Sequence, residues 1–178
     1  VQSTAARIAP GFDGPDPAGA SIDARRLLPD ARAAISHAEQ TGRADVLWGL
    51  LEHLAYSCFY DGHIDEALDW GARAAVIDDG SDPGAAAPGL VSWALLATSR
   101  GDHDEIVDAV ERAQTVAEEA NDQRSLGRAL LLGAAHDSWH RPAGASTAIA
   151  AGVALCADSG DLVWSAWGGC GDALALTF

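Results

Sequence analysis

The chain has 178 residues, of which 48% are hydrophobic and 21% are charged, a balance typical of a folded globular protein and not of a disordered chain. Its formal net charge is −15, because 26 acidic residues outnumber 11 basic ones, which argues against a surface that binds nucleic acid or anionic membranes. No apolar run reaches the roughly 18 residues of a membrane-spanning helix, and no signal peptide is recognised. The acidity indicates a well-solvated surface or, alternatively, a basic partner or cationic ligand.

The N-terminal residues 1–20 are expected to form an extended lead-in, because prolines and glycines crowd this stretch and disfavour a helix. Ser21 is the predicted N-cap of the first helix. Pro29 is predicted to interrupt that helix, which resumes over residues 30–40 and ends at Gly42.

Beyond this point, helical runs alternate with short turns. Apolar residues recur three and four positions apart, which indicates amphipathic helices, and no stretch shows the alternation of a β-strand. The predicted helices cover residues 44–60, 64–77, 90–99, 104–120, 123–139, 143–157 and 162–176. We therefore predict an all-α fold of antiparallel neighbours joined by short loops.

The helical runs repeat with a period of about 39 residues. The turn residues Gly62, Gly101 and His140 are one such interval apart, and small or apolar residues hold equivalent places in all three units. The predicted repeat domain covers residues 21–178. Its units are 44–82, 83–121 and 122–160, with partial units at 21–43 and 161–178.

The clearest unit runs from Leu51 to Ala74, where "LEHLAYSC" precedes a turn glycine and a helix marked by small residues. This pattern resembles a tetratricopeptide repeat, although that family's unit is shorter, about 34 residues. The longer, alanine-rich units are similar to the repeat segments of large bacterial LuxR-type or ATPase-containing transcriptional regulators. The resemblance implies a right-handed solenoid of stacked helical hairpins that senses a ligand or partner in the cytoplasm without catalysis.

The resemblance also implies a concave face, lined by the first helix of each hairpin. Two tyrosines and a phenylalanine beside an acid are suitable recognition groups there. The alternative is that Phe59 packs between helices and the tyrosines cover its edge. The implied occupant is a protein or peptide partner, or a small-molecule effector. The candidate binding residues are Glu52, Tyr56, Phe59, Tyr60, Leu95, Thr98 and Asp137.

The histidines offer a weaker alternative function. His136 and His140 lie one helical turn apart and could chelate a metal, but no third ligand is evident. His63 and His103 follow turn glycines beside acidic residues that suit a helix start, so a structural role is predicted. We expect no metal, no cofactor and no catalytic residue, since nucleophile elbows and phosphate loops are missing. A metal-binding or enzymatic role for His136 and His140 remains the third hypothesis.

Three cysteines, Cys58, Cys156 and Cys170, are widely spaced in helical, largely apolar stretches. An odd number without a C-x-x-C pair argues against a disulfide framework or zinc knot. We expect three buried free thiols, as is usual in the reducing cytoplasm.

The last predicted helix begins with Trp164 and Trp167. They either cover the end of the solenoid or form an interface, and the second interpretation makes the chain a self-association scaffold, for example a homodimer. The sequence contains no Met and its apolar pattern runs to the last residue, so we expect a piece of a longer protein, or a mature or trimmed chain.

Overall fold

The computed structural model describes residues 1–10, 16–140 and 144–175, and within these ranges the chain forms nine α-helices and no β-strand. The all-α prediction is confirmed. No helix in the described ranges is both long and apolar enough to cross a membrane. The helices are α1 (Gln2–Ile8), α2 (Pro17–Thr41), α3 (Ala44–Asp61), α4 (Ile64–Ile77), α5 (Pro83–Arg100), α6 (His103–Glu119), α7 (Gln123–His140), α8 (Ala145–Asp158) and α9 (Leu162–Ala175).

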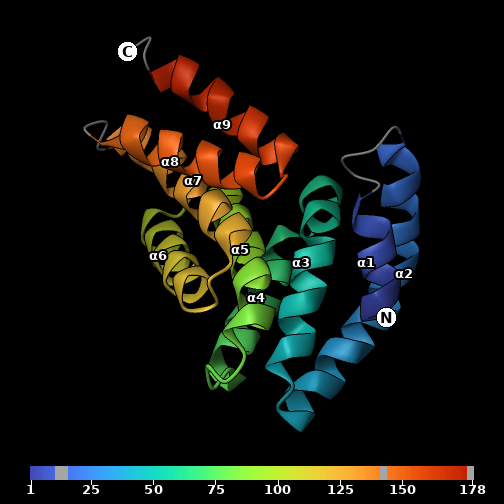
Figure 1. Ribbon diagram of the computed structural model, residues 1–178. Helices are drawn as coiled ribbons and strands as arrows, with labels where there is room; N and C mark the ends of the chain where they lie inside the picture. The colour runs from blue at the N-terminus through green and yellow to red at the C-terminus, as the bar shows by residue number, and fades with distance from the viewer. Residues whose placement is uncertain (11–15, 141–143, 176–178) are drawn as a thin grey trace.

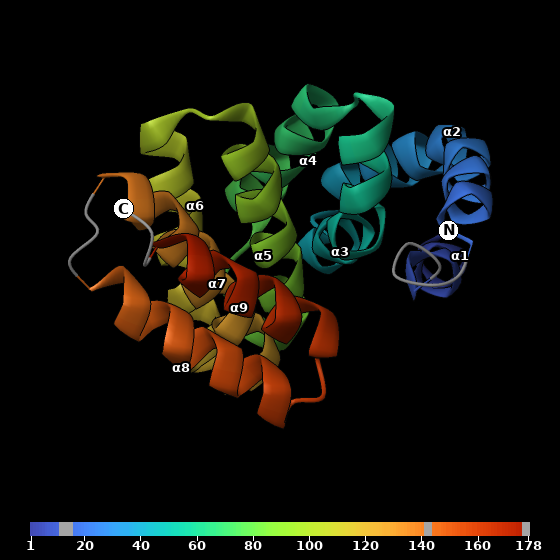
Figure 2. The ribbon, with the colours of Figure 1, turned by 90° about the horizontal axis from the view of Figure 1, so that it is seen from above.

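The chain passes from α1 and α2 at one side of the molecule, through α3, α4 and α5, to α6, α7, α8 and α9 (Figure 1). Helices α1 and α2 lie at one side and α8 and α9 at the other, as the view from above also shows (Figure 2). Substantial packing joins helices that are one or two places apart in the chain. A continuous cluster of buried side chains nevertheless extends from Ala5 in α1 to Trp164 in α9. Each helix thus packs mainly on the helices one or two places before and after it in the chain.

The prediction of an extended lead-in is wrong for residues 2–8 and 17–20, which are helical, and residues 11–15 lie outside the described residues. Residues Gln2–Ile8 form α1, which packs on α3 through the fully buried Ala5. Gly49 of α3 leaves room for the Gln2 side chain, because a Cβ there would lie 1.9 Å from the side-chain nitrogen of Gln2. The helix depends on a tertiary contact that local composition does not reveal.

Helix α2 also differs from its prediction at both Ser21 and Pro29. Its N-cap is Asp16, whose carboxylate accepts a hydrogen bond from the Gly19 amide at 2.9 Å. The helix continues through Pro29, although a proline removes one backbone hydrogen bond and costs about 3 kcal/mol. Buried residues continue at helical spacing on both sides of the proline, and their burial outweighs this cost: Ala24, Leu27, Leu28, Ala31, Ile35 and Ala38.

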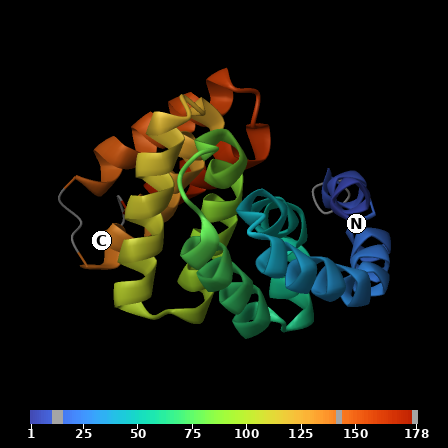
Figure 3. The same ribbon diagram turned by 90° about the horizontal axis from the view of Figure 1, so that it is seen from below.

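The predicted turn glycines are confirmed at Gly42, Gly62 and Gly101, which end α2, α3 and α5 with φ of 66°, 78° and 84°. Helix α5 begins earlier than the predicted residue 90, because Asp82 caps it by accepting from the Ala85 amide at 3.0 Å. Seen from below, α1 and α2 (blue) lie at one side of the molecule and α8 (orange) at the other (Figure 3).

Candidate functional site

The first group of predicted binding residues lies on α3, at the surface. Phe59 and Tyr60 are 40% and 66% exposed, and their ring centroids are 5.1 Å apart in an edge-to-face arrangement. The alternative in which Phe59 packs between helices is therefore wrong. Tyr56 is half-buried, and Glu52 places a carboxylate oxygen 3.7 Å from the His53 ring.

The remaining predicted residues do not join this group around one cavity. Leu95 packs against the core, and the Thr98 hydroxyl donates to its own helix at Ala94 O, 2.8 Å away. Asp137 lines a different space, a cavity of about 260 Å³ between α6 and α7, together with Leu130 and Ala134. The seven residues are thus spread over three helices, and those on α3 and α5 do not line this cavity.

The two tryptophans of α9 differ in their surroundings. Trp164 is 5% exposed, with the Arg128 guanidinium 5.3 Å from its ring centroid, so its prediction as an interface residue is wrong. It belongs to the buried core cluster and contacts Arg128 of α7 instead. Trp167 is 46% exposed and lies edge-on to Trp164, with ring centroids 5.4 Å apart. Self-association through Trp167 stays a prediction.

An ion cluster around the buried Asp161 lies beside Trp164. Asp161, in the turn before α9, accepts hydrogen bonds from Arg124 Nε at 3.0 Å and Arg128 Nε at 2.6 Å. Burial acts to raise the pKa of Asp161, but the two guanidinium groups outweigh it and hold the pKa below its ordinary value. Because Oδ2 of Asp161 accepts from both arginines and Oδ1 accepts from the Trp164 amide, the cluster is structural.

The cysteines are not equally accessible. Cys58 and Cys156 are buried as predicted, but Cys170 is exposed, so the prediction of three buried thiols is wrong there. Burial is the largest cause that raises the pKa of Cys58, to about 12, and burial also raises the pKa of Cys156.

We expect a thiol reagent such as DTNB to label Cys170 alone in the folded chain, because only a thiolate attacks it and the other two thiols are buried and protonated. Absorbance at 412 nm should show one fast thiol in buffer and three in denaturant. The Cys170→Ser variant should lose the fast phase. Fast reaction of a second thiol in the native protein would contradict the burial of Cys58 and Cys156.

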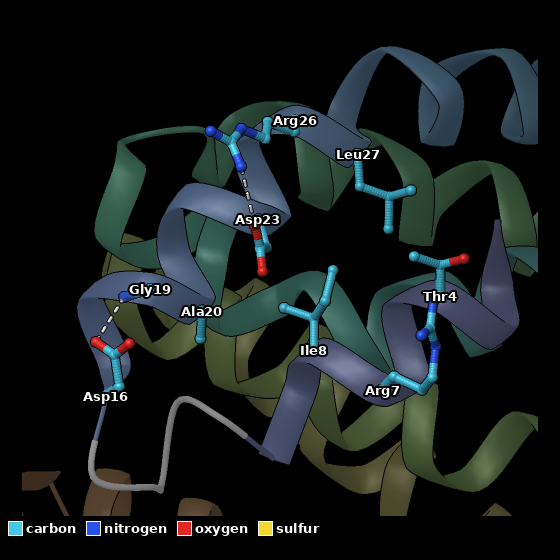
Figure 4. A pocket seen from close by; sticks show the side chains of 9 residues that line it. All are labelled: Thr4, Arg7, Ile8, Asp16, Gly19, Ala20, Asp23, Arg26 and Leu27. Atoms are coloured by element: carbon cyan, nitrogen blue, oxygen red, sulfur yellow. Dashed lines mark hydrogen bonds and ion pairs between the residues drawn. The ribbon is translucent and has the colours of Figure 1, made fainter.

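A cavity with a volume of about 530 Å³ lies between α1 and α2 (Figure 4). Ile8 of α1 and Leu27 of α2 face it from its two sides, and charged side chains stand around it. Asp23 is paired with Arg26 at 3.3 Å. The cavity is lined by Thr4, Arg7, Ile8, Asp16, Gly19, Ala20, Asp23, Arg26 and Leu27.

Arg7 is unusual among the cations of this acidic protein. Of the arginines in the described ranges, only Arg7 and Arg112 make no ion pair with a carboxylate. Arg7 lines the α1–α2 cavity, whereas Arg112 does not. Sequence reasoning missed this site because it did not predict α1, which forms one wall.

No family model, curated protein or solved structure matches this chain. The arguments about its site therefore rest on geometry and charge.

Sequence reasoning also missed a contact between two histidines. His103, predicted to be structural, and His136, predicted to pair with His140, approach each other from α6 and α7 with ring nitrogens 2.7 Å apart. The His140 side chain lies outside the described residues. The antiparallel order of the helices could have indicated this contact, since the start of α6 lies beside the end of α7. Among the described residues, no group of three or more potential metal ligands is present.

Proposed function

We propose that this chain is a non-catalytic, cytoplasmic helical-repeat module of a bacterial transcriptional regulator, and that it binds an effector between α1 and α2. The regular spacing of its helices supports a solenoid of stacked helical hairpins. Helices α3, α5, α7 and α9 begin at residues 44, 83, 123 and 162, so successive starts are 39, 40 and 39 residues apart. Packing restricted to near neighbours is also typical of stacked repeats.

The α1–α2 cavity is the best candidate for the binding site. Its volume of about 530 Å³ falls within the range common for small-molecule sites. Ile8, Ala20 and Leu27 provide an apolar wall, and Arg7 supplies a positive charge that no carboxylate of the described chain neutralises. The unpaired Arg7 is the observation that carries the proposal. The effector is a small amphipathic molecule with an anionic group.

Binding in this cavity also offers a simple route to a response. Helix α1 is short and reaches the rest of the molecule through its packing on α2 and α3. A ligand held between α1 and α2 would favour one position of α1 on α3, where Gln2 lies against Gly49. The effector would then change the surface that the module presents to its partner.

We expect Arg7→Glu to weaken binding of 8-anilinonaphthalene-1-sulfonate, an amphipathic sulfonate, by about tenfold, because the favourable charge becomes repulsive. Fluorescence titration measures this dissociation constant. Arg112→Glu is the matched control, since it makes the same change in net charge at the other unpaired arginine. Equal weakening in both variants would indicate a general charge effect and contradict the proposed site, as would unchanged binding in Arg7→Glu.

A further inference from the structure

A pair of histidines joins the start of α6 to the end of α7. His103 is the first residue of α6, and His136 lies one turn before the end of α7. His103 Nδ1 is 2.7 Å from His136 Nε2, the ring centroids are 4.8 Å apart and the ring planes are inclined by 35°. His103 is exposed and His136 is half-buried, so solvent reaches the pair.

The geometry of this contact suits a metal ion. A neutral imidazole carries one N–H and one nitrogen lone pair, so at 2.7 Å one of the two facing nitrogens donates a proton to the other. The N–H of one ring and the lone pair of the other therefore face each other across the space between the rings. A tetrahedral ion with metal–nitrogen bonds of about 2.0–2.1 Å places its two nitrogens roughly 3.3 Å apart. The two side chains must move apart and rotate for both nitrogens to reach one ion.

We propose that His103 and His136 together bind a borderline divalent transition metal such as Cu²⁺, Ni²⁺ or Zn²⁺. The ion replaces the shared proton and bridges α6 to α7, and water fills its remaining coordination positions. Imidazole nitrogen is a preferred ligand for these three ions, and Cu²⁺ binds most tightly in the usual order of affinities. The site differs from the His136–His140 pair considered from the sequence, because its two ligands come from different helices.

The surroundings favour a cation. Asp102 and Asp104 flank His103 in the sequence, and Asp137 follows His136. Negative charge within a few residues of the pair attracts a divalent ion in a chain that is already strongly acidic. The cavity between α6 and α7 is lined by His136 and Asp137, so an ion at the pair would also fix one edge of that cavity.

The decisive experiment is calorimetric titration of the untagged protein with CuCl₂, NiCl₂ and ZnCl₂. We expect one tight Cu²⁺ per chain, weaker Ni²⁺ and Zn²⁺ binding, and at least tenfold weaker Cu²⁺ binding in both His103→Gln and His136→Gln. His37→Gln is the matched control, because it removes an exposed histidine from α2, far along the chain from the pair. It should bind Cu²⁺ as the wild type does.

Thermal melting and circular dichroism distinguish loss of metal binding from loss of the fold. Cu²⁺ in hundredfold excess over its dissociation constant should raise the melting temperature by about 5 °C in the wild type and not in His103→Gln. Circular dichroism should show that His103→Gln retains its helix content, as expected for a change at an exposed helix start. The variant His140→Gln separates the two histidine pairs. Loss of binding in His140→Gln but not in His103→Gln would overturn the proposal, and so would the absence of Cu²⁺ binding to the wild type.

Discussion

Replacing Gly89 with alanine should destabilise the fold by about 3 kcal/mol, although alanine is the better helix former by about 1 kcal/mol. A Cβ at this position of α5 would lie 2.6 Å from the carbonyl oxygen of Trp48 and 2.7 Å from its Cα. These atoms belong to the backbone of α3 and cannot rotate away as a side chain could. The two helices must therefore separate, and the buried Trp48 loses its packing.

Gly169 provides the matched control for this prediction. It lies in α9, and a Cβ there would meet nothing within 4 Å, so Gly169→Ala should stabilise the chain by about 0.5–1 kcal/mol. Urea unfolding followed by circular dichroism at 222 nm and by tryptophan fluorescence gives both values. If the two alanine variants unfolded at the same urea concentration, the close approach of α3 and α5 would be refuted.

The sequence predicted well those elements that depend on local pattern. Residues 64–77 were expected to be helical from apolar spacing alone, and α4 has the same bounds. Gly62 and Gly101 were expected at turns, and both adopt the left-handed conformation that glycine accepts without a Cβ penalty. Local chemistry decides these features, so one sequence suffices to predict them.

Features that depend on distant partners could not be predicted. Helix α1 forms because Ala5 is buried against α3, and α2 passes through Pro29 because flanking residues such as Leu28 are buried. The burial of Trp164 depends on Arg128, which lies 36 positions earlier in the sequence and covers the tryptophan ring. Such contacts require knowledge of which helix faces meet.

In the candidate sites, too, residue type could be read from the sequence, whereas the packing of distant residues could not. The chemistry of Tyr60 and Asp137 was evident from residue type, but no pattern indicated that they would lie apart. The α1–α2 cavity required a helix that the prolines and glycines of the N-terminal stretch argued against. The pairing of His103 with His136 required the antiparallel order of α6 and α7, whereas the i, i+4 rule directed attention to residues within one helix.

Removing the carboxylate of Asp161 should destabilise the chain by about 2–3 kcal/mol. The side chain is 4% exposed and binds two arginines, of which Arg128 is 19% and Arg124 is 57% exposed. Deleting one partner of a buried ion pair leaves the other partner without its counter-charge, which costs about 3–5 kcal/mol when both are buried. The effect is smaller here because water can solvate Arg124.

Two substitutions divide this effect into its parts. Asp161 also accepts a hydrogen bond from the Trp164 amide at 3.4 Å, within the first turn of α9. Asp161→Asn removes the charge and retains an oxygen for this contact, whereas Asp161→Ala removes both, so alanine should be the more destabilising change. Asp158→Asn is the matched control. That exposed acid lies at the end of α8, where the helix dipole disfavours a negative charge, and its loss should be neutral or slightly stabilising.

The pH dependence of Asp161→Asn provides an independent check on the ion cluster. The folded-state pKa of Asp161 lies below its ordinary value, so its charge stabilises the fold fully above the unfolded-state pKa of about 3.9. The stabilisation is lost as the pH falls from that value through the folded-state pKa. The difference in unfolding free energy between wild type and Asp161→Asn should therefore be constant from pH 7 to pH 5 and shrink from about pH 4 downward. A difference that grew as the pH fell would mean that burial, and not the two arginines, determines the charge of Asp161.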